Sequence, residues 1–169
     1  TTWCTVEPVT SKPKVCLVVG NAHGGSTVTN VVLGQHAEVF SAGSLRGFPD
    51  NGQLVAGNFC SCGDEATTCA FWAVVAQRVA PHAESSSRRY HLYSGILEAS
   101  SKKWVIDVDH GLKSVVEVAA QQDLVVRIVY VNRSLPGLLF SQIRKSRERG
   151  ELRRPVVDYI RLCLKVVTL

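Results

Sequence analysis

The hydrophobic residues of this chain fall into short continuous runs, separated by segments in which apolar residues follow a helical spacing. Three runs are rich in valine, leucine and isoleucine, which is typical of strands buried on both faces, and lie at residues 15–19, 104–108 and 124–131. A shorter run at residues 36–40 predicts a further strand. Helical spacing predicts helices at residues 26–33, 71–79, 88–100, 112–120 and 136–149. Buried strands that alternate with helices predict a three-layer α/β fold, with helices on both faces of a central parallel sheet.

Polar and glycine-rich segments separate these elements without dividing the chain into two domains. Residues 1–13 form an N-terminal lead-in, and residues 41–58, rich in Gly, Ser, Asn and Pro, form a loop. A last helix is expected at residues 155–169, which are still apolar where the sequence stops. We therefore expect a single domain over residues 1–169.

The segment between the first strand and the first helix is rich in glycine. Gly20, Gly24 and Gly25 allow the backbone to curl so that N–H groups point inward, and Ser26 then opens the helix. This P-loop-like strand–turn–helix has the Gly-x4-Gly spacing of a Walker loop, but Ser26 occupies the lysine position. His23 is the basic residue that could replace the lysine. The alternative is a glycine-rich turn that binds nothing.

Polar groups also follow the later predicted strands. Residues 107–110 end one strand, and residues 132–134 follow another. Because ligands bind beyond the carboxyl ends of parallel strands, we expect all three exits to face one crevice. Arg133 and Ser141, eight residues farther on, could together hold one phosphate. Taken singly, Arg133 is as well explained by a surface ion pair and Ser141 by a hydroxyl on a helix.

Composition and charge narrow the class of protein. The chain is 46% hydrophobic and 20% charged, which is typical of a globular domain, and no apolar run approaches the ~20 residues of a membrane span. No signal-like apolar segment opens the sequence, so we expect a cytoplasmic location. The net charge is +5, with many basic residues at 144–154. Such a run is usually a solvated helix face, and without interleaved aromatic residues it does not favour a nucleic-acid partner.

Six cysteines are present, and three of them are close together in the sequence. Cys60, Cys62 and Cys69 could be zinc ligands without an obvious fourth, a disulfide with a spare thiol, or packing residues. Their Cys-x-Cys spacing differs from the usual Cys-x2-Cys knuckle, so the sequence predicts no metal site. Cys16 lies in a predicted strand and is expected to be a buried thiol.

Two of these segments resemble motifs of the sulfotransferase family that uses PAPS (3′-phosphoadenylyl sulfate). The segment GNAHGGSTVTNVVLGQH resembles the family's 5′-phosphosulfate loop, and RIVYVNRSLPGLLFSQIRKSRERG resembles its 3′-phosphate motif. Between them, CSCGDEATTCAFW and VIDVDHG resemble a bacterial-type branch of the family. The resemblance covers residues 14–169. It implies transfer of a sulfuryl group from PAPS to a hydroxyl or amine acceptor, with 3′,5′-ADP as the product and no metal.

The resemblance also implies roles for individual residues. The 5′-phosphosulfate would be held by His23, Gly24, Gly25, Ser26 and Thr27, and the 3′-phosphate by Arg133 and Ser141. His23 departs from the family's Lys or Arg, and Ser134-Leu135-Pro136 departs from its Asn-Pro or Asp-Pro. The family continues past the last helix of this chain, so the resemblance implies an incomplete domain.

The general base is the least determined of these roles. A histidine just after a strand serves as the base in the family, and His110 lies at the comparable place. Its ordinary pKa suits proton abstraction near neutral pH. Asp107 or Asp109 could orient His110 or replace it, and Lys113 could stabilise charge on the sulfuryl group. The resemblance implies an acceptor that is a small molecule, a carbohydrate or a lipid.

Two other functions fit parts of the sequence. A P-loop nucleotide kinase or NTPase would use WVIDVD as its Walker B strand, although the loop lysine is absent. A non-catalytic remnant would instead bind an anionic partner through residues 144–154.

Overall fold

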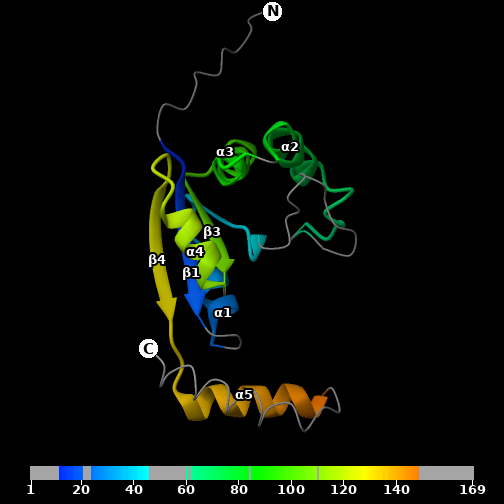
Figure 1. Ribbon diagram of the computed structural model, residues 1–169. Coiled ribbons are helices and arrows are strands. Elements are labelled where there is room, and N and C mark those ends of the chain that lie inside the picture. The colour runs from blue at the N-terminus through cyan, green and yellow to red at the C-terminus, as the bar shows by residue number, and fades with distance from the viewer. Residues whose placement is uncertain are drawn as a thin grey trace, which may run out of the picture.

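The computed structural model describes residues 12–20, 24–45, 60, 62–83, 85–109 and 111–148. Within these residues, four strands form one parallel sheet in the order β2-β3-β1-β4 (Figure 1). The strands are β1 (Lys14–Gly20), β2 (Val39–Ser41), β3 (Trp104–Asp109) and β4 (Val125–Val131). The helices are α1 (Ser26–Leu33), α2 (Ala70–Val79), α3 (Arg88–Ser100), α4 (Leu112–Ala119) and α5 (Leu135–Glu148), and a 3₁₀ turn, η2 (Ala80–His82), follows α2. The predicted α/β fold with a central parallel sheet is therefore confirmed.

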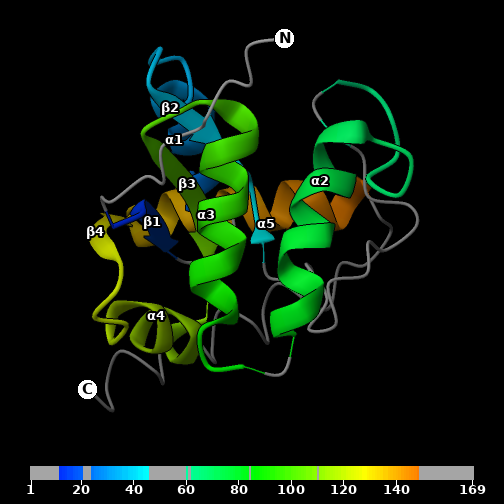
Figure 2. The same cartoon turned by 90° about the horizontal axis from the view of Figure 1, so that it is seen from above.

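The strand order determines which face of the sheet each helix covers. The connection from β1 runs to β2 at one edge, whereas the connection from β3 crosses β1 to reach β4 at the other. Such crossovers are right-handed, and these two connections run in opposite directions across the sheet. Helix α1, in the first connection, therefore lies on one face, and α4, in the second, lies on the other. Helices α2 and α3 lie side by side on the α4 face, as Figure 2 shows. The sheet is thus the middle of three layers.

The main core lies between the sheet and α2, α3 and α4. Side chains alternate along each strand, so Val15, Leu17 and Val105 point to this face. They pack against buried residues of the three helices, Val75, Val79, Leu92, Tyr93, Ile96, Val115 and Val118. A smaller cluster on the other face contains Val18, Ile106 and Val108. The continuous apolar runs of β1 and β3 thus have both faces buried.

Helix α1 forms where the sequence predicts it, but its three valines do not face the sheet. Val28, Val31 and Val32 are each more than half exposed, whereas Ser26 and Asn30 are buried. The helix begins directly after Gly25, whose φ is 111°, so the turn sets the rotation of the helix about its axis. The sequence pattern thus predicted the helix but not the face that it buries.

Strand β2 is shorter than predicted at its amino-terminal end. Residues 36–38 form a turn in which the His36 carbonyl accepts a bond from Val39 N–H and the His36 ring accepts one from Glu38 N–H. Most of the predicted loop at 41–58, the lead-in up to residue 11 and the predicted helix at 155–169 lie outside the described residues. Among the described helices, none is long and apolar enough to cross a bilayer.

Candidate functional site

Strand β1 is flanked by β3 and β4, so the three predicted exits are neighbours. Val19 pairs with Asp109 of β3, and Gly20 pairs with Val131 of β4. All the strands point in the same direction, and α5 lies across their carboxyl-terminal edge (Figure 1). This register brings the ends of β1, β3 and β4 to the same edge of the sheet.

Two glycines, Gly20 and Gly25, lie close to the end of β4. A Cβ added at Gly20 would lie 2.5 Å from the Val131 carbonyl oxygen, so only glycine allows this approach. Gly25 has the left-handed φ noted above, and a Cβ there would lie 3.7 Å from Val131 Cγ1. The glycines therefore bring the beginning of α1 close to the segment that leads to Arg133.

The first turn of α1 offers backbone N–H groups to an anion. Its N-cap residue is Gly25, which has no side chain with which to cap the helix. The Thr29 hydroxyl donates instead to the Gly25 carbonyl oxygen, at 3.2 Å, and so fastens the first turn. Ser26 is buried and Thr27 is exposed. A helix start with uncapped N–H groups and a glycine turn is the geometry that binds phosphate or sulfate groups in proteins.

Arg133 and Ser141 lie on the β4 side of this turn. Arg133 follows β4 directly and is exposed, and a Cβ added at Gly137 would lie 3.0 Å from its Nε. Its side chain thus passes over the first turn of α5. Ser141 is half-buried in the same helix, about two turns from its beginning. Arg133 thus lies in the short connection before α5, and Ser141 lies within α5.

Asp107 and Asp109 both accept hydrogen bonds from other groups of the protein. Asp107 is 1% exposed and accepts hydrogen bonds from the Tyr93 hydroxyl, at 2.8 Å, and from Leu45 N–H, at 3.0 Å. Asp109 is also buried and accepts a bond from Gly111 N–H, at 2.7 Å. Asp107 therefore holds elements together, and its burial argues against a role as the base on an acceptor. Asp109 holds the backbone of Gly111, which directly precedes α4.

Arg89 and Tyr93 contact Asp107, and the sequence did not predict either contact. Arg89 Nη1 lies 3.8 Å from Asp107 Oδ2. Burial raises the pKa of the Asp107 carboxyl, although the Leu45 N–H, the Tyr93 hydroxyl and the Arg89 guanidinium each lower it. The available signal was that Tyr93 lies on the apolar face of a predicted helix, which by itself indicates a core residue.

A cavity lies at the other end of the sheet. It has a volume of about 370 Å³ and lies under the end of α1. Its lining includes Cys16, Leu33, Val39, Trp104, Ile106 and Arg127. These residues belong to the amino-terminal parts of the strands or to α1, so the cavity is separate from the three exits.

His23 and His110 lie outside the described residues, whereas Gly24, Gly25 and the other predicted donor-binding residues are placed. Comparisons with protein-family models, with curated proteins and with solved structures found no match. The function is therefore inferred from the residues of this chain.

Proposed function

We propose that this protein is a PAPS-dependent sulfotransferase, which moves a sulfuryl group to a hydroxyl or amine acceptor by in-line transfer. One observation carries the proposal. Gly25 and Arg133, more than 100 residues apart in the sequence, follow two paired strands, and Gly25 lies against Val131, two residues before Arg133. A donor with a phosphate at each end of its adenosine needs two such anion sites near each other.

The glycine turn fits the 5′ end of the donor. When bound, PAPS would supply an activated sulfuryl group and a phosphate leaving group. Gly20 and Gly25 keep side chains away from the backbone, and the first turn of α1 presents its N–H groups. The exposed Thr27 hydroxyl can donate to the same anion. Donors that are already fixed in position stabilise the charge that develops on the leaving oxygen. His23 is the basic residue in the loop sequence for this role.

The β4 exit fits the 3′ end of the donor. Arg133 supplies a planar guanidinium, which binds phosphate through two parallel hydrogen bonds. Ser141 supplies a hydroxyl donor from α5. Because α5 crosses the carboxyl edge of the sheet (Figure 1), both groups lie beyond the strand that pairs with β1.

His110 follows β3, on the opposite side of β1 from Arg133. In this proposal the acceptor approaches from the β3 side, and an imidazole nitrogen of His110 takes the proton of its hydroxyl or amine. The Asp109 carboxylate accepts a hydrogen bond from Gly111 N–H, and Gly111 follows His110 in the sequence. Positioning of donor and acceptor would then supply much of the rate enhancement.

A nucleotide kinase or NTPase is the second candidate. The observation in its favour is buried Asp109 at the end of β3, beside the glycine turn, where a magnesium-binding carboxylate would lie. Two features disfavour it. Ser26 occupies the loop lysine position, and Asp109 Oδ1 is already bonded to Gly111 N–H.

Thermal unfolding with added nucleotides separates these functions. At about 100 times its Kd, a ligand stabilises the folded state by about 2.7 kcal/mol, which corresponds to a Tm increase of roughly 5–10 °C for a domain of this size. We expect 3′,5′-ADP to raise the Tm without magnesium. R133A should lose the increase, whereas the matched control R127A, which changes an exposed arginine of β4 away from the exits, should keep it.

The other outcomes discriminate equally clearly. No effect of 3′,5′-ADP together with an increase that needs both ATP and magnesium would establish the kinase alternative. Stabilisation by 3′,5′-ADP without transfer of labelled sulfate from PAPS to any hydroxyl or amine acceptor would indicate a non-catalytic remnant. An equal response of R133A and the wild type would overturn the proposed 3′-phosphate site.

A further inference from the structure

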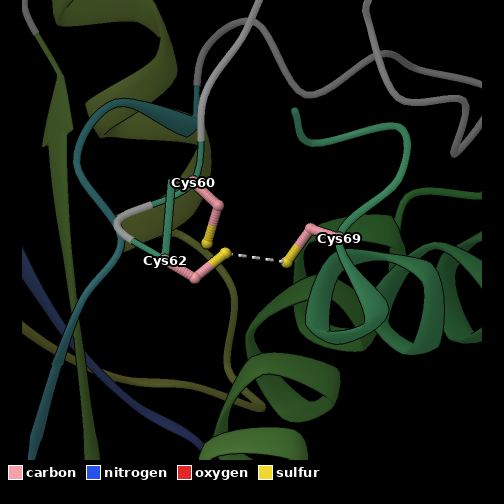
Figure 3. A group of neighbouring side chains, drawn as sticks. All are labelled: Cys60, Cys62 and Cys69. Atoms are coloured by element: carbon pink, nitrogen blue, oxygen red, sulfur yellow. Dashed lines mark hydrogen bonds between the residues drawn. The ribbon is translucent and has the colours of Figure 1, made fainter. Parts of the chain in front are cut away.

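Three cysteine thiols gather beside the N-terminus of α2. Cys60 and Cys62 come from a turn, and Cys69 directly precedes the helix. Figure 3 shows the three side chains pointing toward one another, and their Sγ atoms all lie within 4.8 Å of one another. The Cys62 and Cys69 Sγ atoms are 3.6 Å apart.

Backbone hydrogen bonds hold this arrangement. Cys60 N–H donates to the Asp64 carbonyl oxygen at 2.8 Å, and Gly63 N–H donates to the Cys60 carbonyl oxygen at 3.0 Å. Gly63 has a φ of 96°, a value that favours glycine, so the turn can close tightly. Cys69 N–H donates to the Glu65 carbonyl oxygen at 2.9 Å. The backbone thus brings the thiols together without a disulfide between them.

The geometry separates the three explanations that the sequence left open. Packing suits Cys69, which is buried, but not Cys62, which is exposed. A disulfide needs an S–S distance of about 2.05 Å and leaves one thiol unused. In a tetrahedral zinc site with Zn–S bonds of about 2.3 Å, neighbouring sulfurs are about 3.8 Å apart, close to the separation of Cys62 and Cys69.

We propose that Cys60, Cys62 and Cys69 bind one Zn²⁺ as thiolates, contrary to the expectation from their spacing. Each thiol loses its proton to solvent when it binds the ion. The positive end of α2 stabilises the thiolate of Cys69, which directly precedes the helix. The fourth position is taken by water or by the Asp64 carboxylate, whose Oδ2 lies 3.7 Å from Cys62 Sγ.

The ion would have a structural effect on the helical layer. It would fasten the turn to α2, whose Val75 and Val79 are fully buried in the main core. Helix α2 packs against α3, which carries Tyr93, the partner of Asp107 (Figure 2). The site is independent of the proposed sulfuryl transfer, so the failure of either proposal leaves the other standing.

Metal analysis of the whole protein, purified under reducing conditions, tests the site. We expect one zinc per chain in the wild type and in the control C16S, which removes a thiol of β1, and none in C60S/C62S/C69S. Replacement of zinc by Co²⁺ should give the intense near-ultraviolet absorption of thiolate-to-cobalt charge transfer. Because Cys62 is exposed, C62S keeps the core intact and remains informative if the triple variant does not fold. It should weaken zinc binding at least tenfold and reduce the charge-transfer absorption.

Three results would overturn the proposal. One is a reduced wild type without zinc that shows no charge-transfer absorption with Co²⁺. Another is zinc retained by the triple variant, or bound by C62S as tightly as by the wild type. The third is a peptide with Cys62 linked to Cys69 in alkylated protein purified without reductant, since it would establish the disulfide. D64N assigns the fourth position, because a change in its Co²⁺ spectrum indicates the carboxylate and an unchanged spectrum indicates water.

Discussion

The buried hydrogen bond between Tyr93 and Asp107 joins α3 to the centre of the sheet. Tyr93 is fully buried, and its hydroxyl donates to Asp107 Oδ2 at 2.8 Å. The substitution Tyr93→Phe removes this donor but keeps the aromatic ring and its packing. One carboxylate oxygen then remains buried without its hydrogen bond.

The expected cost follows from the charge of the acceptor. A hydrogen bond to a charged group contributes about 1.5–3 kcal/mol, and the loss includes the cost of leaving that oxygen unsatisfied. Leu45 N–H and Arg89 still face the carboxylate, so the loss should stay below the ~3–5 kcal/mol of a buried charge whose partner is removed. We therefore expect Y93F to lower the free energy of unfolding by about 2–3 kcal/mol at neutral pH.

The free energy of unfolding should also depend on pH, because Asp107 titrates differently in the folded and unfolded states. Because burial raises the pKa of Asp107, the folded state binds this proton more tightly than the unfolded state does. The contribution of Asp107 to the free energy of unfolding therefore falls as pH rises from its ordinary pKa, about 3.9, through the raised value. Tyr93 is one of the groups that lower this pKa, so Y93F should raise it further. The loss in Y93F should shrink to about 1 kcal/mol where the carboxyl is protonated.

Urea unfolding at several pH values, followed by tryptophan fluorescence, measures these effects. The control is Tyr90→Phe on the same helix, where water can replace a hydroxyl lost from a partly exposed residue. In a D107A background, Y93F should cost much less than in the wild type, because the acceptor is gone. A loss below ~0.5 kcal/mol in Y93F, or the same loss in both backgrounds, would refute the reasoning.

Three further predictions concern the exits and α1. G20A should force the ends of β1 and β4 apart at the Val131 carbonyl oxygen and lower the free energy of urea unfolding by about 1–3 kcal/mol. G137A should leave stability unchanged or raise it by up to ~1 kcal/mol, since alanine favours a helix, yet weaken 3′,5′-ADP binding in calorimetry by displacing Arg133. Unchanged affinity would contradict the proposed role of that arginine. V32S should change stability by less than about 0.5 kcal/mol, because Val32 is 63% exposed, and a larger loss would show that α1 buries its valines.

The spacing of hydrophobic residues predicted the helices and strands, because each of them is specified by its own residues. The helix predicted at residues 88–100 has these bounds in the structure, and it ends at Ser101 in a left-handed conformation. The run at residues 104–108 predicted β3, since strands buried on both faces must be continuously apolar. In both segments the burial pattern and the sequence pattern agree.

Contacts between elements were less predictable. Tyr93 and Asp107 are fourteen residues apart on different elements, and neither pattern says that α3 covers the face of β3 to which Asp107 points. For the same reason, the sequence did not predict how α1 is rotated about its axis. Its valines have the spacing of a core-facing stripe, but the glycine turn directs Asn30 to the sheet instead.

The strand order matters most for the proposed function, and no local pattern predicts it. Neighbouring strands are about 4.8 Å apart. Each strand inserted between two exits would therefore move the groups at those exits about 4.8 Å farther apart. With β1 between β3 and β4, the glycine turn adjoins both the Asp109 exit and the Arg133 exit. The connections that leave β1 and β3 run to opposite faces, which is where α/β sheets open a crevice for a ligand. In the proposed reaction, the acceptor oxygen must approach the sulfur opposite the bridging oxygen of the 5′-phosphosulfate. An acceptor on the β3 side of the glycine turn would make this approach away from a 3′-phosphate held at β4.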